Sequence, residues 1–181
     1  MATLQISDLL VDTYTKGLNT LLHILDVAAS HAAANGVDPS TYLDARLVED
    51  QRPLSFQIQN ATRQVRLVVG RVTGTEIPGV EDTEKTVDEF RARIASALEF
   101  LKGVDRKGID EFVERGESVT QPFGPGLSTQ VSAKDAVLGH AIPNFYFHVS
   151  TAYGILRARG VPVGKKDWIR EWFSPNQIPK A

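Results

Sequence analysis

The chain has 181 residues, of which 42% are hydrophobic, and this is enough apolar surface for a compact folded domain and too much for a disordered chain. The formal net charge is -2, from 20 basic and 22 acidic residues, so there is no excess of positive charge for binding nucleic acid or an anionic membrane. The absence of cysteine excludes disulfides, thiol nucleophiles and cysteine zinc sites.

The start of the chain lacks the pattern of a targeting segment. Residues 1–14 carry acidic side chains and have neither the positive start nor the continuous apolar segment of a secretion signal. No apolar run approaches the ~18 residues of a membrane span. We therefore expect a cytoplasmic protein whose partner is a small molecule, not nucleic acid or a membrane.

Two long amphipathic helices are predicted in the first part of the chain. Apolar residues recur at helical spacing over residues 6–35, and Gly36 follows directly as a stop signal. A connection with turn-forming residues at 38–40 and about one helical turn leads to Pro53, which suits the first position of a helix. The second helix keeps one apolar face to about Val72.

A third helix is predicted after a polar loop over residues 73–85. Thr86 and Glu89 stand at the spacing of a capping box, in which each side chain bonds the backbone N–H of the other residue. The apolar stripe that follows ends near Gly103. The acidic residues of the loop are expected to be solvated, because negative charge is favourable just before a helix N-terminus.

The segment 118–131 breaks the helical pattern. β-Branched residues stand on either side of Phe-Gly-Pro-Gly-Leu, which predicts a short hairpin or an extended excursion. Ser132 and Asp135 resemble a second capping box and open a helix that runs to Arg159. Pro143 is expected to kink or interrupt this helix, because its ring removes a backbone donor and crowds the preceding turn.

A last short helix is expected over residues 165–173, where it folds Trp168 and Trp172 back onto the other helices. Together with the four long helices it predicts an all-α fold. This fold is a four-helix bundle with one long connection, a short hairpin or extended insertion before the fourth long helix, and a short C-terminal helix. No repeat or second domain is visible, so residues 1–181 are expected to form one domain.

The fourth long helix carries the candidate site. Asn144 and His148 are four residues apart, so both side chains should project from the same side of the helix. His148 stands among apolar residues, and a buried imidazole needs hydrogen-bond partners or a metal. The alternative interpretation is a core histidine that is bonded to a neighbouring helix.

Further candidates lie on the second and fourth long helices. The second helix offers four amides that could face the same cavity, namely Gln57, Gln59, Asn60 and Gln64. Asp50 stands just before this helix. Tyr153 could act as a donor or general acid, although an aromatic residue at this spacing more often fills the core. Thr151 could bind a ligand, although a helical threonine more often bonds its own backbone.

Common catalytic motifs are missing from the sequence. It has no P-loop, no glycine-rich dinucleotide turn, no Gly-x-Ser-x-Gly elbow and no His-Glu-x-x-His, so the usual residues for nucleotide hydrolysis, hydride transfer, serine esterase chemistry and zinc proteolysis are not present. Among the other histidines, His23 is expected to be exposed and His31 to interact with the dipole at the end of its helix. His140 is as well explained by capping or solvent exposure as by a role in a site.

Three stretches of the sequence carry a family resemblance: residues 43–59, 81–94 and 143–168. In this order they resemble the signature stretches of a family of uncharacterised proteins within the DinB/YfiT-like superfamily, whose members are regarded as metalloenzymes. The resemblance spans nearly the whole chain and implies a four-helix bundle with a long connection. Members that bind metal carry one histidine on the second helix and two, as His-x-x-x-His, near the start of the fourth.

The present sequence departs from that metal site. By the resemblance, His148 matches the second histidine of the His-x-x-x-His motif, Asn144 takes the place of the first, and the corresponding region of the second helix shows Gln57. One imidazole and two amides lack the donors that hold zinc or nickel. We therefore expect a ligand pocket that persists without a metal cofactor.

Three functions are compatible with these residues. The first is a metal-independent acid/base enzyme of the isomerase, dehydratase or cyclase type, in which His148 transfers a proton and Gln57, Asn144 or Tyr153 orients a carbonyl or hydroxyl group. The second is a non-catalytic ligand-binding or stress-related bundle. The third is a degenerate metalloenzyme with a hard ion held by Asp50 and His148. A homodimer is also expected, because broad apolar helix faces often pair across two-fold axes.

Overall fold

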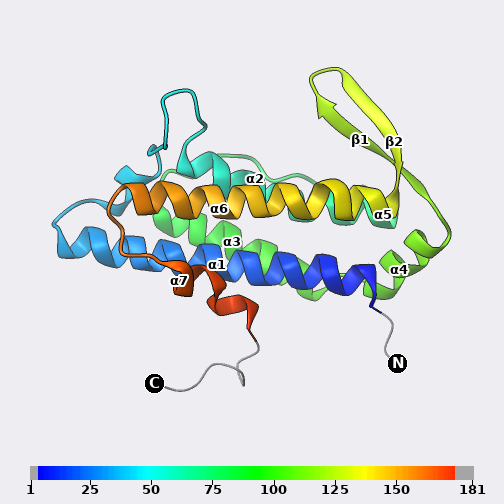
Figure 1. The fold of residues 1–181 in the computed structure, drawn as a ribbon, viewed down its shortest axis with the longest axis horizontal. Coiled ribbons are helices and arrows are strands. Elements are labelled where there is room, and N and C mark those ends of the chain that lie inside the picture. The colour runs from blue at the N-terminus through cyan, green and yellow to red at the C-terminus, as the bar shows by residue number, and fades with distance from the viewer. Residues whose placement is uncertain (1–3, 174–181) are drawn as a thin grey trace.

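The computed structural model describes residues 4–173 and is mostly helical. Four long helices lie side by side along its longest axis (Figure 1): α1 (Ile6–Ala34), α2 (Leu54–Thr73), α3 (Val87–Lys102) and α6 (Ile142–Ala158). The predicted helical architecture is therefore confirmed. Residues 1–3 and 174–181, the two ends of the domain predicted over residues 1–181, lie outside the residues that the structure describes. Within residues 4–173, no helix combines the length and the apolarity that crossing a bilayer requires.

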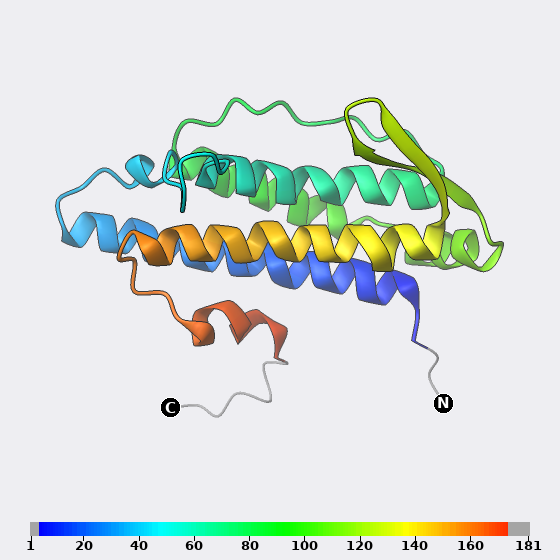
Figure 2. The ribbon, with the colours of Figure 1, turned by 45° about the horizontal axis from the view of Figure 1, so that its top comes forward.

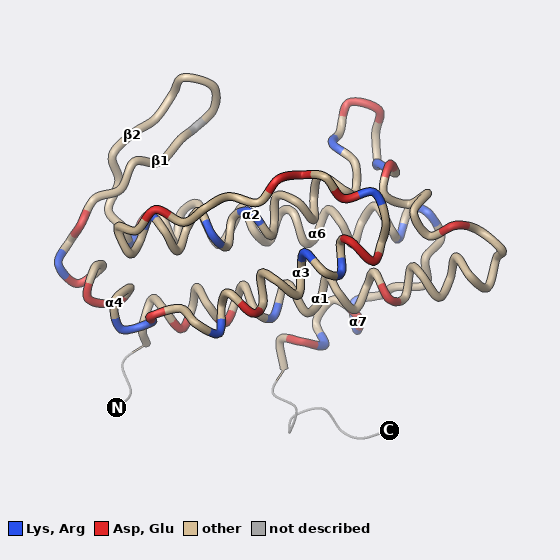
Figure 3. The backbone as a smooth tube through the Cα atoms, turned by 180° about the vertical axis from the view of Figure 1, so that it is seen from behind, with Lys and Arg blue, Asp and Glu red and all other residues tan. Residues whose placement is uncertain are grey.

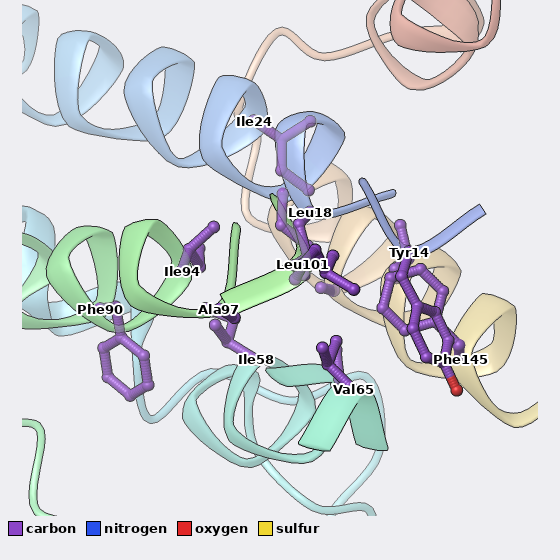
Figure 4. Packing of buried hydrophobic residues seen from close by; sticks show 14 of the residues in the cluster. Tyr14, Leu18, Ile24, Ile58, Val65, Phe90, Ile94, Ala97, Leu101 and Phe145 are labelled. Carbon is purple, nitrogen blue, oxygen red and sulfur yellow. The ribbon is translucent and has the colours of Figure 1, made fainter. Parts of the chain in front are cut away.

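The core lies between the four long helices. Helix α1 packs against α3 and α6, and α2 packs against the same two helices, so α1 and α2 occupy opposite corners of the bundle. Each fully buried aliphatic or aromatic side chain contributes roughly 1.5–3 kcal/mol to stability. Figure 4 shows core residues from all four helices, including Leu18, Ile58, Phe90, Ile94 and Phe145.

The contact between α1 and α6 depends on a glycine. The rings of Tyr14 and Phe145 lie 4.7 Å apart between centroids and are inclined by 53°. A methyl group added at Gly17, one turn after Tyr14, would overlap the Phe145 ring. Only a residue without a Cβ therefore allows the two helices to approach this closely.

The predicted helix ends and the first connection agree with the structure. Thr86 and Glu89 form the capping box at the start of α3, with the Thr86 hydroxyl accepting from the Glu89 N–H and the Glu89 carboxylate accepting from the Thr86 N–H. Helix α2 ends at Gly74, which adopts the left-handed conformation with φ of 65°. The connection from α1 to α2 contains one short 3₁₀ helix, η1 (Pro39–Tyr42), as predicted.

A purely all-α fold is not correct, because the segment before the last long helix forms an antiparallel hairpin of β1 (Ser118–Gly124) and β2 (Leu127–Ser132). Helix α4 (Arg106–Glu114) precedes the hairpin and was not predicted. Figure 2 shows the hairpin and the α1–α2 connection at opposite ends of α2 and α6.

The last long helix starts irregularly. Helix α5 (Ala133–Asp135) is followed by a π-helical segment, η2 (Ala136–Ala141), before α6 begins. Pro143 lies in the first turn of α6. The interruption expected from Pro143 is thus found as a wider turn just before it, because proline cannot donate to the carbonyl of the preceding turn.

The C-terminal helices fold back onto α1, as predicted. Helices α7 (Lys165–Ile169) and η3 (Arg170–Trp172) both contact α1. The rings of Trp168 and Trp172 stack at 5.5 Å.

Candidate functional site

His148 lies inside the contact between α2 and α6. Its side chain projects from α6 toward α2, and the residue is only 4% exposed. The ring nitrogen Nδ1 is 2.8 Å from Oε1 of Gln57, and Nε2 is 2.9 Å from Nδ2 of Asn60. Both polar atoms of the buried imidazole are therefore paired with amides of α2.

The hydrogen bonds assign one tautomer to this imidazole. The Nε2 amide group of Gln57 donates to the backbone carbonyl of Arg52 at 2.9 Å, so its Oε1 faces His148 and must accept. Nδ1 of His148 consequently carries the proton, and Nε2 accepts from the Asn60 amide. A protonated ring would place two N–H donors against Gln57 and Asn60, and the second would meet an amide nitrogen that is itself a donor.

Burial and charge keep the imidazole neutral. Burial, together with the smaller effect of the nearby positive charge of Arg63, lowers the pKa of His148 from 6.5 to about 4. At neutral pH the ring is uncharged. It presents one fixed donor and one fixed acceptor.

Two phenylalanine rings flank the imidazole edge-on. The ring centroid of Phe56 on α2 is 6.1 Å from that of His148, and that of Phe147 is 5.2 Å away. Phe147 is 58% exposed, and Asn60 is half-buried. Both apolar rings thus pack against the imidazole, and Asn60, which pairs with the acceptor nitrogen, is less buried than Gln57, which pairs with the donor nitrogen.

The structure brings some of the predicted site residues together. Gln57 is buried and bonds His148 directly. Thr151 is buried one turn after His148 and Asn144 is half-buried one turn before it, so both share its side of α6. Within residues 4–173, neither of their side chains makes a hydrogen bond to His148.

Two other predicted residues are placed elsewhere. Asp50 is exposed in the connection that precedes α2. Tyr153 is half-buried against the core, and five residues of helix place it about 140° around α6 from His148. In contrast, Asn60, one of the α2 amides expected to face the same cavity, bonds the imidazole directly. It lies three residues after Gln57, on the same face of α2.

His23 and His31 make bonds that the sequence did not indicate. His23 was expected to be exposed, but it is half-buried and pairs through Nε2 with Asp167 of α7 at 2.8 Å. His31 bonds the hydroxyl of Tyr42 through Nδ1 at 2.9 Å. Both imidazoles therefore tie neighbouring segments to α1.

Arg93 of α3 ties the acidic connection between α2 and α3 to the bundle. Its side chain is 3% exposed and pairs with Asp82 at 3.0 Å and with Glu84 at 2.7 Å. Its other N–H groups donate to the Thr62 hydroxyl and to two backbone carbonyls. Although burial raises the pKa of Glu84, hydrogen bonds from Arg93 and a neighbouring amide lower it to a greater extent.

The prediction that this acidic loop is simply solvated is therefore wrong for the carboxylates that face Arg93. Figure 3 shows acidic residues of the connection alongside α2. The loop neutralises a buried guanidinium, which sequence periodicity alone does not show.

Comparison with known proteins assigns the chain to a family. Residues 6–169 match the family described as "Domain of unknown function (DUF1993)". The chain belongs to this family. A crystal structure of a DinB family member from Shewanella denitrificans is 37% identical in sequence and covers 96% of this chain and 95% of its own, with a TM-score of 0.83. Among curated proteins, none matches the chain significantly.

In this DUF1993 protein, the residues around His148 do not fit a transition metal. Both ring nitrogens are engaged by side-chain amides, and the neighbouring Asn144 adds another amide. Amides are poor ligands for zinc and nickel. Within residues 4–173, no group of three histidine or acidic side chains is placed to hold a metal ion.

Proposed function

We propose that the protein binds a small molecule with an apolar or aromatic body and one hydroxyl group, and that this ligand binds beside His148. The observation that supports the proposal is the neutral, buried imidazole whose acceptor nitrogen faces the half-buried Asn60. A hydroxyl group would replace the Asn60 amide as the donor to Nε2. The apolar body would then contact Phe56 and Phe147.

The existing hydrogen bonds reduce the cost of such binding. Gln57 holds Nδ1 in place, so the ring does not need to be ordered when the ligand arrives. Replacing one donor by another leaves no buried nitrogen unpaired. Asn144 and Thr151, one turn to either side of His148, are proposed to contact the ligand.

Phenol and anisole form a matched pair that tests the proposal, since they are similar in shape but anisole has no O–H group. In NMR titrations, the wild-type protein should bind phenol roughly fivefold or more tightly than anisole, because one hydrogen bond is worth about 1 kcal/mol. Asn60→Ala should strengthen phenol binding, because it removes the competing donor. His148→Phe should abolish the preference, whereas Asn19→Ala on α1 should leave it intact.

Two results would count against this proposal. The first is that neither compound shifts the resonances of Phe56, Asn60 and Phe147. The second is that the preference for phenol survives in His148→Phe. If His148→Phe does not fold, Asn60→Ala still decides, because unchanged phenol affinity in that variant would exclude binding at Nε2.

A metal-independent acid/base enzyme of the isomerase, dehydratase or cyclase type is the second candidate. It is favoured by the way Gln57 fixes the Nδ1–H group, because this leaves Nε2 as an acceptor that faces the half-buried Asn60, as in an oriented base. With any substrate that is turned over, His148→Phe should lower kcat by roughly 100-fold or more while KM changes little. A variant that loses affinity but keeps kcat would identify a binding protein.

A further inference from the structure

A pocket of about 250 Å³ lies between α2, α3 and the connection that joins them, residues 74–86. Figure 2 shows this connection running back along α2, so that its residues cover part of the pocket. Arg66 of α2 and Ser96 of α3 are among the lining residues. The site around His148 lies instead in the contact between α2 and α6, so the pocket is a separate place on the molecule.

At one end of the pocket, the polar groups of Arg93 and Glu84 are already satisfied. Nε of Arg93 donates to the Thr62 hydroxyl at 2.6 Å, and its other N–H groups bond two carboxylates and two backbone carbonyls. These bonds use all of the five N–H donors of a guanidinium. The Glu84 carboxylate also accepts from the amide of Gln59 at 3.0 Å. This end therefore offers no free charge to a ligand.

Arg66 is the arginine of this pocket whose charge is not neutralised by a carboxylate. Arg63 and Arg93, which lie on either side of the same connection, both pair with Asp82. Within residues 4–173, the one hydrogen bond of the Arg66 side chain runs from Nη2 to the Ser96 hydroxyl at 3.4 Å, which is long for such a bond. Most of the N–H donors of Arg66 thus remain for an anion.

Contacts on α3 hold the Arg66 guanidinium in place. Its Cζ atom lies 4.7 Å from the centroid of the Phe100 ring, within the range of a cation–π contact. The bond to Ser96 fixes a second side of the group. Because neither contact removes the positive charge, an anionic ligand would meet a guanidinium that is already ordered, and it would lose less entropy on binding.

The remaining walls of the pocket are small and apolar. Val80 of the connection and Ala92 and Ala97 of α3 line it. An engineered protein cavity of about 150 Å³ holds a benzene molecule. A pocket of about 250 Å³ therefore has room for one aromatic ring and a carboxylate group.

We propose that this pocket binds a small aromatic monocarboxylate. The two carboxylate oxygens match the planar fork of the Arg66 guanidinium. The Ser96 hydroxyl, which accepts from Arg66, is free to donate its own proton to the same carboxylate. The ring then packs against Val80, Ala92 and Ala97.

The other charges of the pocket favour a single negative charge on the ligand. The Glu89 carboxylate also lines the pocket, where it accepts from the backbone N–H groups of Lys85 and Thr86. A second negative charge on the ligand would meet Glu89 and would have no unpaired guanidinium of its own. A dicarboxylate is therefore disfavoured.

Benzoate is the probe for this pocket, with benzamide and benzylamine at equal ionic strength as the uncharged and cationic comparisons. In NMR titrations, benzoate should produce saturable shifts of the Ala92 and Ala97 methyl signals. Benzamide should bind roughly tenfold or more weakly, because its hydrogen bonds to Arg66 involve no second charge. Benzylamine should bind more weakly still.

Two variants separate the charge from the shape of the pocket. Arg66→Gln should lower the affinity for benzoate to that for benzamide, whereas the control Arg71→Gln, which removes the α2 guanidinium that bonds Gln121, should leave it unchanged. Ala92 is exposed on α3, so Ala92→Leu should fold normally. Its larger side chain occupies the place of the ring and should weaken benzoate and benzamide alike.

The proposal is overturned if benzoate causes no saturable shift of the Ala92 and Ala97 signals, or if Arg66→Gln binds benzoate as the wild type does. Equal affinity for benzoate and for benzamide or benzylamine would overturn the carboxylate assignment. If Arg66→Gln does not fold, Ala92→Leu decides, because unchanged benzoate affinity in that variant would exclude this pocket. Phenol binding beside His148 is independent of every one of these results.

Discussion

Acid should destabilise the protein because His148 must stay neutral in its buried position. In the unfolded chain this imidazole takes up a proton near pH 6.5, whereas the folded protein resists protonation until about pH 4. The unfolded state therefore binds more protons between these two values, and stability falls as the pH is lowered through this window. Since one pKa unit corresponds to about 1.4 kcal/mol, the complete effect is roughly 3 kcal/mol.

Chemical denaturation at about pH 7.5 and about pH 4.5 measures this effect. At the lower pH most of it should be present, so we expect His148 to account for a loss of about 2.5 kcal/mol in the free energy of unfolding. Carboxylates such as Glu84 also lose stabilising interactions in acid, so the comparison must be made with His148→Gln. This variant should lose about 2.5 kcal/mol less than the wild type over the same interval.

His31→Gln, on α1, is the matched control and should retain the full acid sensitivity because His148 is still present. An equal loss of stability in wild type and His148→Gln would refute the reasoning. It would mean that the imidazole titrates alike in the folded and unfolded chain.

Two further substitutions test how the bundle is held together. Arg93→Met should cost roughly 3–5 kcal/mol in the free energy of unfolding, because it leaves the nearly buried carboxylate of Glu84 without its charged partner. The control Arg91→Met removes only exposed ion pairs and should cost at most about 1 kcal/mol. If the two substitutions lowered the free energy of unfolding equally, the buried ion pairs of Arg93 would contribute no more to stability than the exposed ion pairs of Arg91. Gly17→Ala should lower stability by roughly 1–3 kcal/mol because its methyl group overlaps Phe145, and Gly139→Ala, which meets no atom within 4 Å, should not produce this loss. A stable Gly17→Ala variant would contradict the close contact between α1 and α6.

The sequence predicts those parts of the fold that depend on local interactions. The apolar periodicity of α1 and the capping box of Thr86 and Glu89 are contained within single helices, and both predictions are confirmed. The Gly-Pro-Gly sequence between the two strands likewise predicted the turn of the hairpin, and this prediction is confirmed. Helix α4 was missed because it is short, and its apolar stripe of Ile109, Phe112 and Val113 spans little more than one turn.

The site was harder to predict because it depends on the register between helices. The burial of His148 follows from its apolar neighbours on α6, and Gln57 was a natural partner. Asn60 was among the α2 amides expected to face the cavity, but which of these amides bonds Nε2 depends on the register between α2 and α6, which no local pattern encodes. The pairing of Arg93 with the acidic connection is a tertiary contact of the same kind. The charge of the loop therefore suggested solvated side chains and did not indicate this pairing.

The protonation state of His148 is most directly tested by ¹⁵N NMR of its ring nitrogens as a function of pH. We expect Nδ1 to carry the proton, Nε2 to remain an acceptor, and both signals to stay constant until they titrate near pH 4. A midpoint near 6.5, or a proton on Nε2 at neutral pH, would contradict the assignment of a fixed neutral imidazole and with it the proposed ligand contact.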